Sequence, residues 1–376
     1  MSREYDLLFP IRVRAILVHL WLRLLGRRSH AIVYWPRAPP KHYMGHCDQK
    51  TVESILDFYY EQGGNFIDTS NNYQFGESEM WIGEWMRRRR NREEMVIATK
   101  YSTNFRGGHG GEGIMANFSG NGAKSLRASV NASLRKLQTD HIDILYVHWW
   151  DFSSSVQEVM QALNQLVLSG SVLYLGISDT PAWIVSKANQ YARDHGLRQF
   201  CVYQGQWSAV RRDFERDIIP MAREEGMALA PWGALGGGSF KTEEQQNALG
   251  GRSVHPTDDQ RRISKVLDAI ALEKNTIITS VALAYVLHKS PYVFPVIGGR
   301  TVEHLKQNIE ALTLELSSKD IDDIESAIPF DIGFPNTILY GQKFPPHPGQ
   351  VWLMGMAGTF DYVPLPKPIK PTKGGE

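Results

Sequence analysis

Residues 63–73 read GGNFIDTSNNY, and the rest of the chain is interpreted outward from this stretch. The paired glycines, Gly63 and Gly64, are typical of a helix end. A short apolar run follows, with Asp68 at its end and Tyr73 five residues later in a polar loop. In a barrel of parallel strands, the carboxyl ends of the strands carry their side chains to one rim, where catalytic groups gather. The stretch therefore predicts a barrel strand that delivers an acid and a phenol to such a rim.

The same alternation of strand and helix extends along the chain. Helical periodicity is expected at 49–62, 77–88, 124–137, 156–169, 181–195, 218–225, between 260 and 289, and at 302–311. Short apolar strands are expected at 30–35, 66–67, 95–99, 142–147, 172–177, 200–203, 227–230 and 292–297. Regular alternation implies parallel strands with right-handed crossovers, and eight such units predict an α/β fold of the (β/α)8 TIM-barrel type. A doubly wound sheet is the alternative, but the sequence has no Gly-x-Gly-x-x-Gly turn after its first strand.

Three segments are expected along the chain. The barrel takes residues 30–328, after an atypical N-terminal extension over 1–29, and a Pro/Gly-rich tail over 329–376 is expected to be an extended surface segment. The apolar run at 15–25 contains His19 and Arg23 and is too short to span a bilayer. A non-core extension is the prediction for it, with a peripheral amphipathic helix as the alternative.

Composition places the chain among soluble globular proteins. It has 376 residues, of which 42% are hydrophobic and 22% charged. Since 41 Lys and Arg face 40 Asp and Glu, the formal charge is +1 and nothing favours a nucleic-acid partner. The basic run 87–90 ends a predicted helix, where cations complement the helix dipole. Two cysteines, Cys47 and Cys201, make neither a metal cage nor a disulfide scaffold, so a reducing, cytoplasmic location is expected.

Polar or ionisable residues stand just past seven consecutive predicted strands. In chain order they are Asp68 with Tyr73, Lys100, His148, Ser178 with Asp179, Gln204, Trp232, and Gly298-Gly299-Arg300. Each alone has a structural explanation, as a turn cap, a solvated lysine or a satisfied histidine. Together, at equivalent positions of a barrel, they predict one site.

The residue types suit protonation of a developing alkoxide. Tyr73 would be the general acid, and a neighbouring Lys100 cation is expected to lower the phenol pKa from its ordinary value of about 10. Asp68 would keep Lys100 charged, and His148 would orient the substrate oxygen by a hydrogen bond. A metal is not expected, because Zn²⁺ would need more ligands than Asp68 and His148 offer.

Such a reaction also needs a hydride source, and the remaining rim residues suit a nicotinamide cofactor. Trp232 has a flat face on which the ring can stack. The side chains of Ser178, Asp179 and Gln204 can hydrogen-bond its carboxamide. The glycines at 298 and 299 precede a helix whose first amides suit a phosphate, and Arg300 suits a 2′-phosphate, which favours NADP over NAD.

Several motifs together carry a family resemblance over about residues 44–312. They are GGNFIDTSNNYQFGESEMWIGEW (63–85), VIATKY (96–101), DILYVHWWD (143–151), GISDTPAW (176–183), YQGQWS (203–208), APWGALGGG (230–238) and PVIGGRTVEHLKQNIEAL (295–312). With these motifs the chain resembles the aldo-keto reductases, most closely the fungal aryl-alcohol dehydrogenase and norsolorinic acid reductase-like branch. The resemblance implies a (β/α)8 barrel, NADPH-dependent carbonyl reduction and a catalytic tetrad of Asp68, Tyr73, Lys100 and His148. It also implies cofactor contacts from Ser178, Asp179, Gln204, Trp232, Gly233, Leu235, Gly236, Gly298, Gly299, Arg300 and Asn308.

Two features depart from the family pattern. Asp179 stands where many members have asparagine, and the first strand, at 31–35, lacks their glycine-containing Leu-Gly-x-Met sequence. The implied reaction is the reversible reduction of an aryl aldehyde or a polyketide-type ketone, in fungal secondary metabolism. The wall of the substrate pocket is expected to come from the loops around Phe105, Trp149 and Trp150 and from the Pro-rich tail. The expected partner is this small-molecule substrate, with no nucleic acid and no membrane span. A non-catalytic NADP-binding regulatory subunit of the same fold is the alternative.

Overall fold

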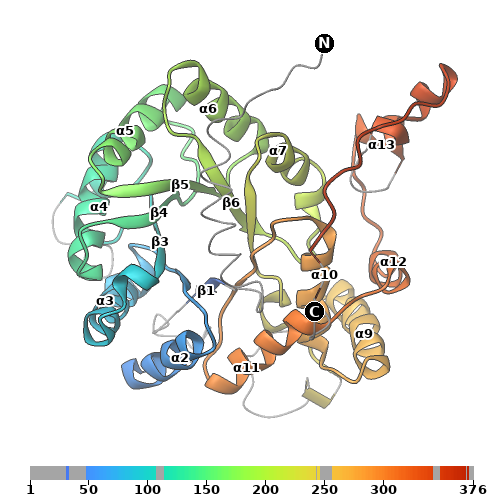
Figure 1. Ribbon diagram of the computed structural model, residues 1–376, viewed down its shortest axis with the longest axis horizontal. Coiled ribbons are helices and arrows are strands. Elements are labelled where there is room, and N and C mark those ends of the chain that lie inside the picture. Colours follow the sequence, from blue (N-terminus) through green and yellow to red (C-terminus); the bar gives the residue numbers. More distant parts are fainter. Residues whose placement is uncertain are drawn as a thin grey trace.

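The computed structural model of the protein describes residues 31–33, 48–106, 114–242, 244–245, 256–341, 348–369 and 371. Strands occupy the centre and helices surround them (Figure 1). The predictions for the extension over 1–29, and for parts of the loop at 107–122 and of the insertion before residue 259, lie outside the described residues.

All eight strands are parallel and close into a barrel in chain order. They are β1 (Ala31–Val33), β2 (Phe66–Asp68), β3 (Val96–Tyr101), β4 (Ile142–Val147), β5 (Val172–Ser178), β6 (Phe200–Gln206), β7 (Ala228–Trp232) and β8 (Val296–Ile297). The atypical first strand closes the ring, because Ile32 is in register with Ile67 of β2 on one side and with Ile297 of β8 on the other. The predicted (β/α)8 fold is confirmed.

The helices follow the strands in alternation. They are α2 (Gln49–Glu61), α3 (Glu77–Arg89), α4 (Ala123–Leu137), α5 (Val156–Leu168), α6 (Ala182–Asp194), α7 (Ile218–Glu224), α9 (Asp258–Glu273), α10 (Ile278–Lys289), α11 (Val302–Glu310), α12 (Ser318–Ser326) and α13 (Asn336–Tyr340). Asp48 caps α2 as predicted, since its side chain accepts a hydrogen bond from the Thr51 amide. Pro181, expected inside the first turn of α6, is its N-cap residue instead.

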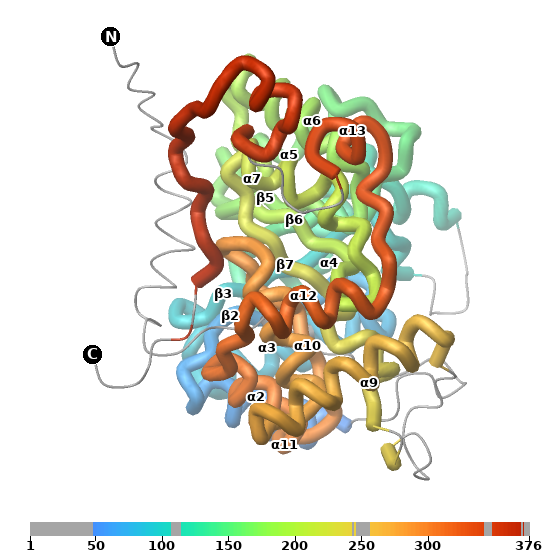
Figure 2. Tube along the Cα trace, turned by 90° about the vertical axis from the view of Figure 1, so that its right-hand side faces the viewer, coloured from blue at the N-terminus to red at the C-terminus, as the bar shows by residue number. Residues whose placement is uncertain are grey.

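Residues after 310 are more helical than the sequence prediction. Helix α12 begins at a capping box, in which Ser317 and Asp320 each accept the other's backbone N–H. The tail, expected to be extended, contains α13 and short 3-10 turns at Pro348–Gln350 and Trp352–Met356. After α12 the chain passes outside the helices to α13 and then runs back over one end of the barrel (Figure 2).

Two apolar layers follow from the alternation of side chains along each strand. The outward layer packs against the helices and includes Ile67, Ile97, Leu145, Leu175 and Tyr203. The inward layer fills the barrel and includes Ala98, Ile144, Tyr146, Val202, Ala228 and Ala230. A site residue two positions beyond an inward residue therefore points into the mouth of the barrel.

Within the described residues, no single helix has both the length and the apolar composition to cross a membrane. Helices α9 and α10 meet that test by length and composition only as a pair, which is bent by 98° at a short break.

Candidate active site

Because side chains alternate along each strand, the predicted residues point inward together at the carboxyl end of the barrel. Asp68 lies two residues beyond Phe66, Lys100 two beyond Ala98, and Gln204 two beyond Val202, each of which packs in the inward layer. His148 and Trp232 hold the equivalent place after Tyr146 and Ala230, two further residues of that layer. One rule of strand geometry thus accounts for the convergence.

A buried ion pair forms the floor of the site. Asp68 and Lys100 are both fully buried, and the Lys100 ammonium donates to Asp68 Oδ1 and, at 2.8 Å, to the Thr69 carbonyl. Gln204 Nε2 donates to Asp68 Oδ2 at 2.8 Å. Burial raises the pKa of Asp68 and lowers that of Lys100, and the contact between the two groups opposes both shifts. The carboxylate is fully engaged, so it holds the ammonium in one place.

Tyr73 lies in the loop beyond this pair. Its ring centroid is 5.3 Å from Lys100 Nζ and 5.9 Å from the His148 ring, which it meets edge to face. The expected lowering of its pKa is wrong: burial raises the pKa of Tyr73 well above the ordinary value, and the charges of Asp68 and Asp179 raise it further. The positive charge of Lys100 is already balanced by Asp68 at this site. Tyr73 is consequently protonated at neutral pH, the state that a proton donor requires.

His148 follows β4 and is held by two hydroxyl groups. Its Nδ1 lies 3.2 Å from Ser70 Oγ and 3.4 Å from Thr103 Oγ1. Trp149 Nε1 donates to Thr103 Oγ1 at 2.9 Å and fixes that hydroxyl in turn. Burial, with the Lys100 charge, lowers the pKa of His148 to about 3, so the imidazole is neutral.

On the β5 and β7 side, Trp232 and Asp179 form a pair at the mouth of the barrel. The indole Nε1 donates to Asp179 Oδ1 at 3.2 Å. Partial desolvation of the carboxylate raises the pKa of Asp179 to about 6, against the opposing effects of Trp232, Lys100 and Ser178. The Ser178 hydroxyl is buried and, within the described residues, makes no hydrogen bond of normal geometry. This hydroxyl is a buried polar group that a ligand amide would satisfy.

The remaining predicted cofactor residues follow β7 and β8. Gly233 and Gly236 have φ of +76° and +65°, which favours glycine, and the Gly236 amide donates to the Gly233 carbonyl at 2.8 Å. Between them, the Leu235 side chain packs against the apolar core. A Cβ at Gly299 would lie 3.0 Å from the His304 Cβ, so a larger residue there would displace α11 by a few tenths of an ångström.

That turn is followed by a capped helix. Gly298, Gly299 and the exposed Arg300 precede Thr301, whose side chain caps α11 by accepting from the His304 amide. Asn308 is buried on the same helix. This group therefore lies at the junction of β8 and α11, whereas the tetrad comes from the ends of β2, β3 and β4 and the loop after β2.

The loop that carries Tyr73 is strained. Gln74 and Phe75 have φ of 47° and 56°, and Gly76 has φ of 96°, so three successive residues are left-handed. This conformation costs a non-glycine residue about 1–2 kcal/mol. The contacts around the loop must offset that cost for Tyr73 to stay in place.

Sequence reasoning missed Tyr146, a second phenol beneath the site. It is fully buried on β4, and its ring centroid lies 5.5 Å from Lys100 Nζ. The strand register aligns Lys100, Tyr146 and Gly176 in one layer. A Cβ at Gly176 would lie 2.5 Å from the Tyr146 ring, so a glycine inside an apolar strand was the available signal.

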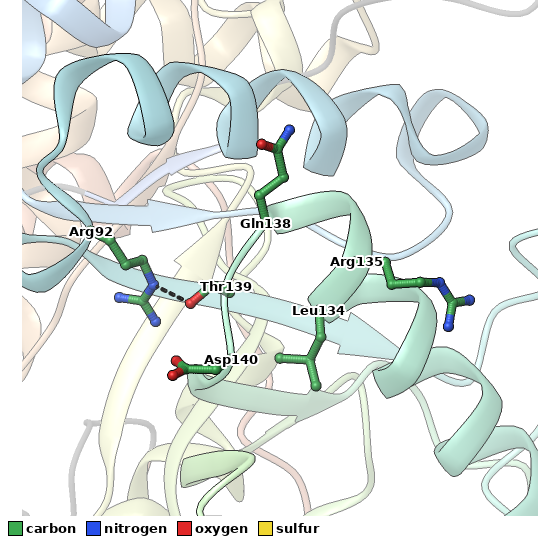
Figure 3. A pocket seen from close by; sticks show the side chains of 6 residues that line it. All are labelled: Arg92, Leu134, Arg135, Gln138, Thr139 and Asp140. Atoms are coloured by element: carbon green, nitrogen blue, oxygen red, sulfur yellow. Dashed lines mark hydrogen bonds between the residues drawn. The ribbon is translucent and has the colours of Figure 1, made fainter.

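A surface pocket lies among the segments that precede β3 and β4, at the end of the barrel opposite the site; Figure 3 shows the residues that line it. Its lining residues are Arg92, Leu134, Arg135, Gln138, Thr139 and Asp140, which belong to the segments before β3 and β4. Arg92 donates to Thr139 Oγ1 at 2.9 Å and to the His141 carbonyl at 2.9 Å, and it pairs with Asp143 at 2.7 Å. The guanidinium therefore links the segments that lead into β3 and β4 and has a structural role at the base of the barrel.

Within the described residues, no group of three or more His, Cys, Asp or Glu has the arrangement of a metal site. The closed barrel with ionisable groups gathered at its carboxyl rim defines a (β/α)8-barrel enzyme.

Comparison with known proteins then gives the family. Residues 40–329 match the model of the aldo/keto reductase family. The chain is 55% identical over 346 residues to norsolorinic acid reductase B of Dothistroma septosporum, covering 87% of this chain and 86% of that protein. It is 52% identical over 334 residues to an aryl-alcohol dehydrogenase of Pestalotiopsis microspora, covering 88% and 86%. A probable aryl-alcohol dehydrogenase of Saccharomyces cerevisiae is 53% identical over 306 residues, covering 79% and 93%.

The chain belongs to the aldo/keto reductase family and is an oxidoreductase acting on carbonyl and alcohol groups. Members of this family generally use NAD(P)H as the cofactor.

Proposed function

We propose that the protein reduces an aryl aldehyde or a polyketide-type ketone to the alcohol, reversibly, with NADPH and with Tyr73 as the general acid. The observation that carries the proposal is the placement of a protonated Tyr73 beside neutral His148, above the buried pair of Asp68 and Lys100. The names of the relatives support the substrate class. We further propose a cytoplasmic location and a part in fungal secondary metabolism.

Each tetrad residue has a role that its surroundings support. Tyr73 keeps its proton until negative charge develops on the substrate oxygen and then donates it. The Lys100 ammonium, 5.3 Å from the Tyr73 ring centroid, stabilises the phenolate that remains. Neutral His148, with Nδ1 engaged by hydroxyl groups, presents Nε2 to the substrate oxygen. Asp68 holds Lys100 in position.

The cofactor residues are those predicted for it, and their chemistry fits the group. Ser178 brings a buried hydroxyl that lacks a hydrogen bond of normal geometry, and Trp232 a half-buried ring whose orientation Asp179 fixes. The glycine turn after β7 and the first turn of α11 suit the phosphates. Arg300 would bind a 2′-phosphate, and the bound nicotinamide would supply hydride.

Replacing Tyr73 with Phe tests the proposal directly. The change removes the proton donor and keeps the ring, so turnover of an aromatic aldehyde should fall by about 10²-fold or more. Cofactor affinity, measured by quenching of protein fluorescence with NADPH, should stay close to that of the parent. Tyr191→Phe, on the outer helix α6, is the matched control.

Two results would contradict the assignment. Parental turnover in the Phe variant would exclude Tyr73 as the acid. Binding of NADPH by the parent protein without turnover of any aldehyde or ketone in an aromatic panel would instead favour a non-catalytic, cofactor-binding regulatory subunit.

Cofactor choice is tested at Arg300. Removing the guanidinium in Arg300→Met should raise the Kd for NADPH by about 10-fold, while the Kd for NADH changes little, because only NADPH has the 2′-phosphate. Arg211→Met, at another exposed arginine, serves as the control. An equal loss of affinity for both cofactors would assign Arg300 a structural role instead.

A further inference from the structure

A second buried ion pair lies beside the loop that carries Tyr73. Glu79, on α3, is fully buried, and its Oε2 pairs with Lys136 Nζ of α4 at 2.5 Å. Glu79 Oε1 accepts a hydrogen bond from Thr99 Oγ1 at 2.6 Å. Thr99 immediately precedes Lys100 on β3, so the pair connects two helices with the strand that carries the site lysine.

The same ammonium reaches the loop itself. Lys136 Nζ donates to the Asn71 carbonyl at 2.8 Å. Its aliphatic stem lies under Gly76, where an added Cβ would be 3.0 Å from Lys136 Cδ. The Lys136 side chain therefore contacts both ends of the segment 71–76, which encloses Tyr73 and the left-handed residues Gln74 and Phe75.

Other contacts fix the start of this segment to the same helix and to β3. Asn71 Nδ2 donates to Ser129 Oγ of α4 at 3.1 Å, and the Asn71 amide donates to the Lys100 carbonyl at 3.1 Å. At the start of the segment the Tyr73 amide donates to the Ser70 carbonyl at 3.2 Å, and within it the Phe75 amide donates to the Asn72 carbonyl at 2.9 Å. These local bonds close tight turns, and Lys136 is the charged group that holds the turns against the barrel.

We propose that the Glu79–Lys136 pair positions Tyr73. Lys136 joins a buried carboxylate to the main chain of the Tyr73 loop, so the strained loop keeps one conformation and the phenol faces His148 and Lys100. Glu79 and Lys136 are positioning residues, since they act through the loop and do not touch the reacting atoms. The inference rests on the proposed role of Tyr73 as the acid.

Lys136→Met tests this, because it keeps the aliphatic stem and removes the ammonium. A misplaced acid lowers the chemical rate, so kcat for an aromatic aldehyde should fall by about 10–100-fold while the Kd for NADPH changes by less than about 2-fold. Hydrogen exchange of the amides of 71–76 should accelerate by about 10-fold or more, with exchange in β4–β6 unchanged.

Lys136→Arg, which keeps the charge, should retain most of the parental kcat and most of the exchange protection of 71–76. Lys124→Met, at the exposed first turn of the same helix, should match the parent.

The proposal is overturned if Lys136→Met retains parental kcat, or if exchange accelerates uniformly over the molecule while kcat per folded protein is unchanged. Should Lys136→Met fail to fold with Glu79 unpaired, the double variant Glu79→Gln/Lys136→Met removes both charges. Parental kcat and parental protection of 71–76 in that double variant would equally overturn it. Parental turnover in Tyr73→Phe would refute the proposed role of Tyr73 as the acid. It would not decide whether the Glu79–Lys136 pair holds the loop, because hydrogen exchange at 71–76 measures that separately.

Discussion

His148 is a half-buried imidazole whose surroundings disfavour its charged form, and this has a consequence for stability. Its pKa is about 3 in the folded protein, from burial and the Lys100 charge, against an ordinary value of 6.5. Below pH 6.5 His148 is therefore protonated in the unfolded chain but not in the folded protein, and stability falls as pH drops from 6.5 toward 3. His148→Gln should remove this contribution, which is at most about 1.4 kcal/mol per pH unit.

Urea unfolding at pH 7.5, 6 and 5 measures that difference. His148→Gln should lose less stability than the parent on acidification. His195→Gln, at an exposed position, is the control and should lose as much stability as the parent. Parallel pH curves for the parent and His148→Gln would show that His148 is accessible to protons in the folded protein.

At the scale of single residues, the sequence predicts the positions of the site residues better than it predicts their pKa values and contacts. Asp68, Lys100 and Gln204 could be placed from strand ends alone, because side chains alternate along a strand. The direction of the Tyr73 pKa could not be predicted, because it depends on the burial of the phenol and on charges that arrive from other elements, Asp179 among them. The contact of Gln204 with Asp68 likewise joins residues 136 positions apart.

At the scale of elements, Gly176 and Tyr146 show how one strand makes room for its neighbour. Gly176→Ala places a Cβ 2.5 Å from the Tyr146 ring and 3.0 Å from Val202 Cγ1. The ring must move, and since it also packs beside Lys100, both stability and turnover should fall. Overpacking of this kind typically costs about 1–3 kcal/mol.

Chemical unfolding and steady-state kinetics check the Gly176 prediction together. Gly355→Ala, where an added Cβ meets nothing within 4 Å, is the control. The double variant Gly176→Ala/Tyr146→Leu should regain part of the stability, because leucine at position 146 is smaller than tyrosine and leaves room for the added Cβ at position 176. A double variant as unstable as Gly176→Ala alone would place the strain elsewhere.

Element boundaries were predictable where a local signal marked them, as at Asp48 before α2 and at Gly63 after it. Helix α12 has such a signal in the capping box of Ser317 and Asp320, although the strand and helix periodicity predicts no helix after residue 311. The Pro and Gly content of the tail predicts an extended segment, whereas α13 and the 3-10 turn at Trp352–Met356 form there and contact each other, as in the hydrogen bond from Trp352 Nε1 to the Ile338 carbonyl at 2.6 Å. Before these helices, Phe330 contacts the guanidinium groups of Arg212 and Arg216, at 4.9 and 5.1 Å from its ring centroid.

At the scale of the whole molecule, a buried charge network ties the last helices to the barrel. Glu215, fully buried after β6, pairs with Arg212 at 2.9 Å and with Lys289 of α10 at 3.2 Å. Glu325 of α12 pairs with the same two cations, and Tyr285 donates to Glu215 Oε1 at 3.2 Å. Burial pushes the pKa of Glu215 up, but Lys289 and Arg212 outweigh it and hold the pKa below the ordinary value. Sequence reasoning could not assemble this network, whose members lie up to 113 positions apart.

Glu215→Gln should destabilise the protein and leave the chemistry nearly intact. The amide cannot balance the two buried cations, and removal of one partner from a buried ion pair costs roughly 3–5 kcal/mol. The network comes from the β6–α7 segment, α10 and α12, whereas the tetrad comes from β2 to β4, so kcat of the folded variant should stay within about twofold of the parent. The surface change Asp323→Asn, which breaks an exposed pair with Lys319, should leave stability close to that of the parent, because solvent screens such pairs. If Glu215→Gln instead lost turnover at unchanged stability, the network would act on the site and not on the attachment of the last helices to the barrel.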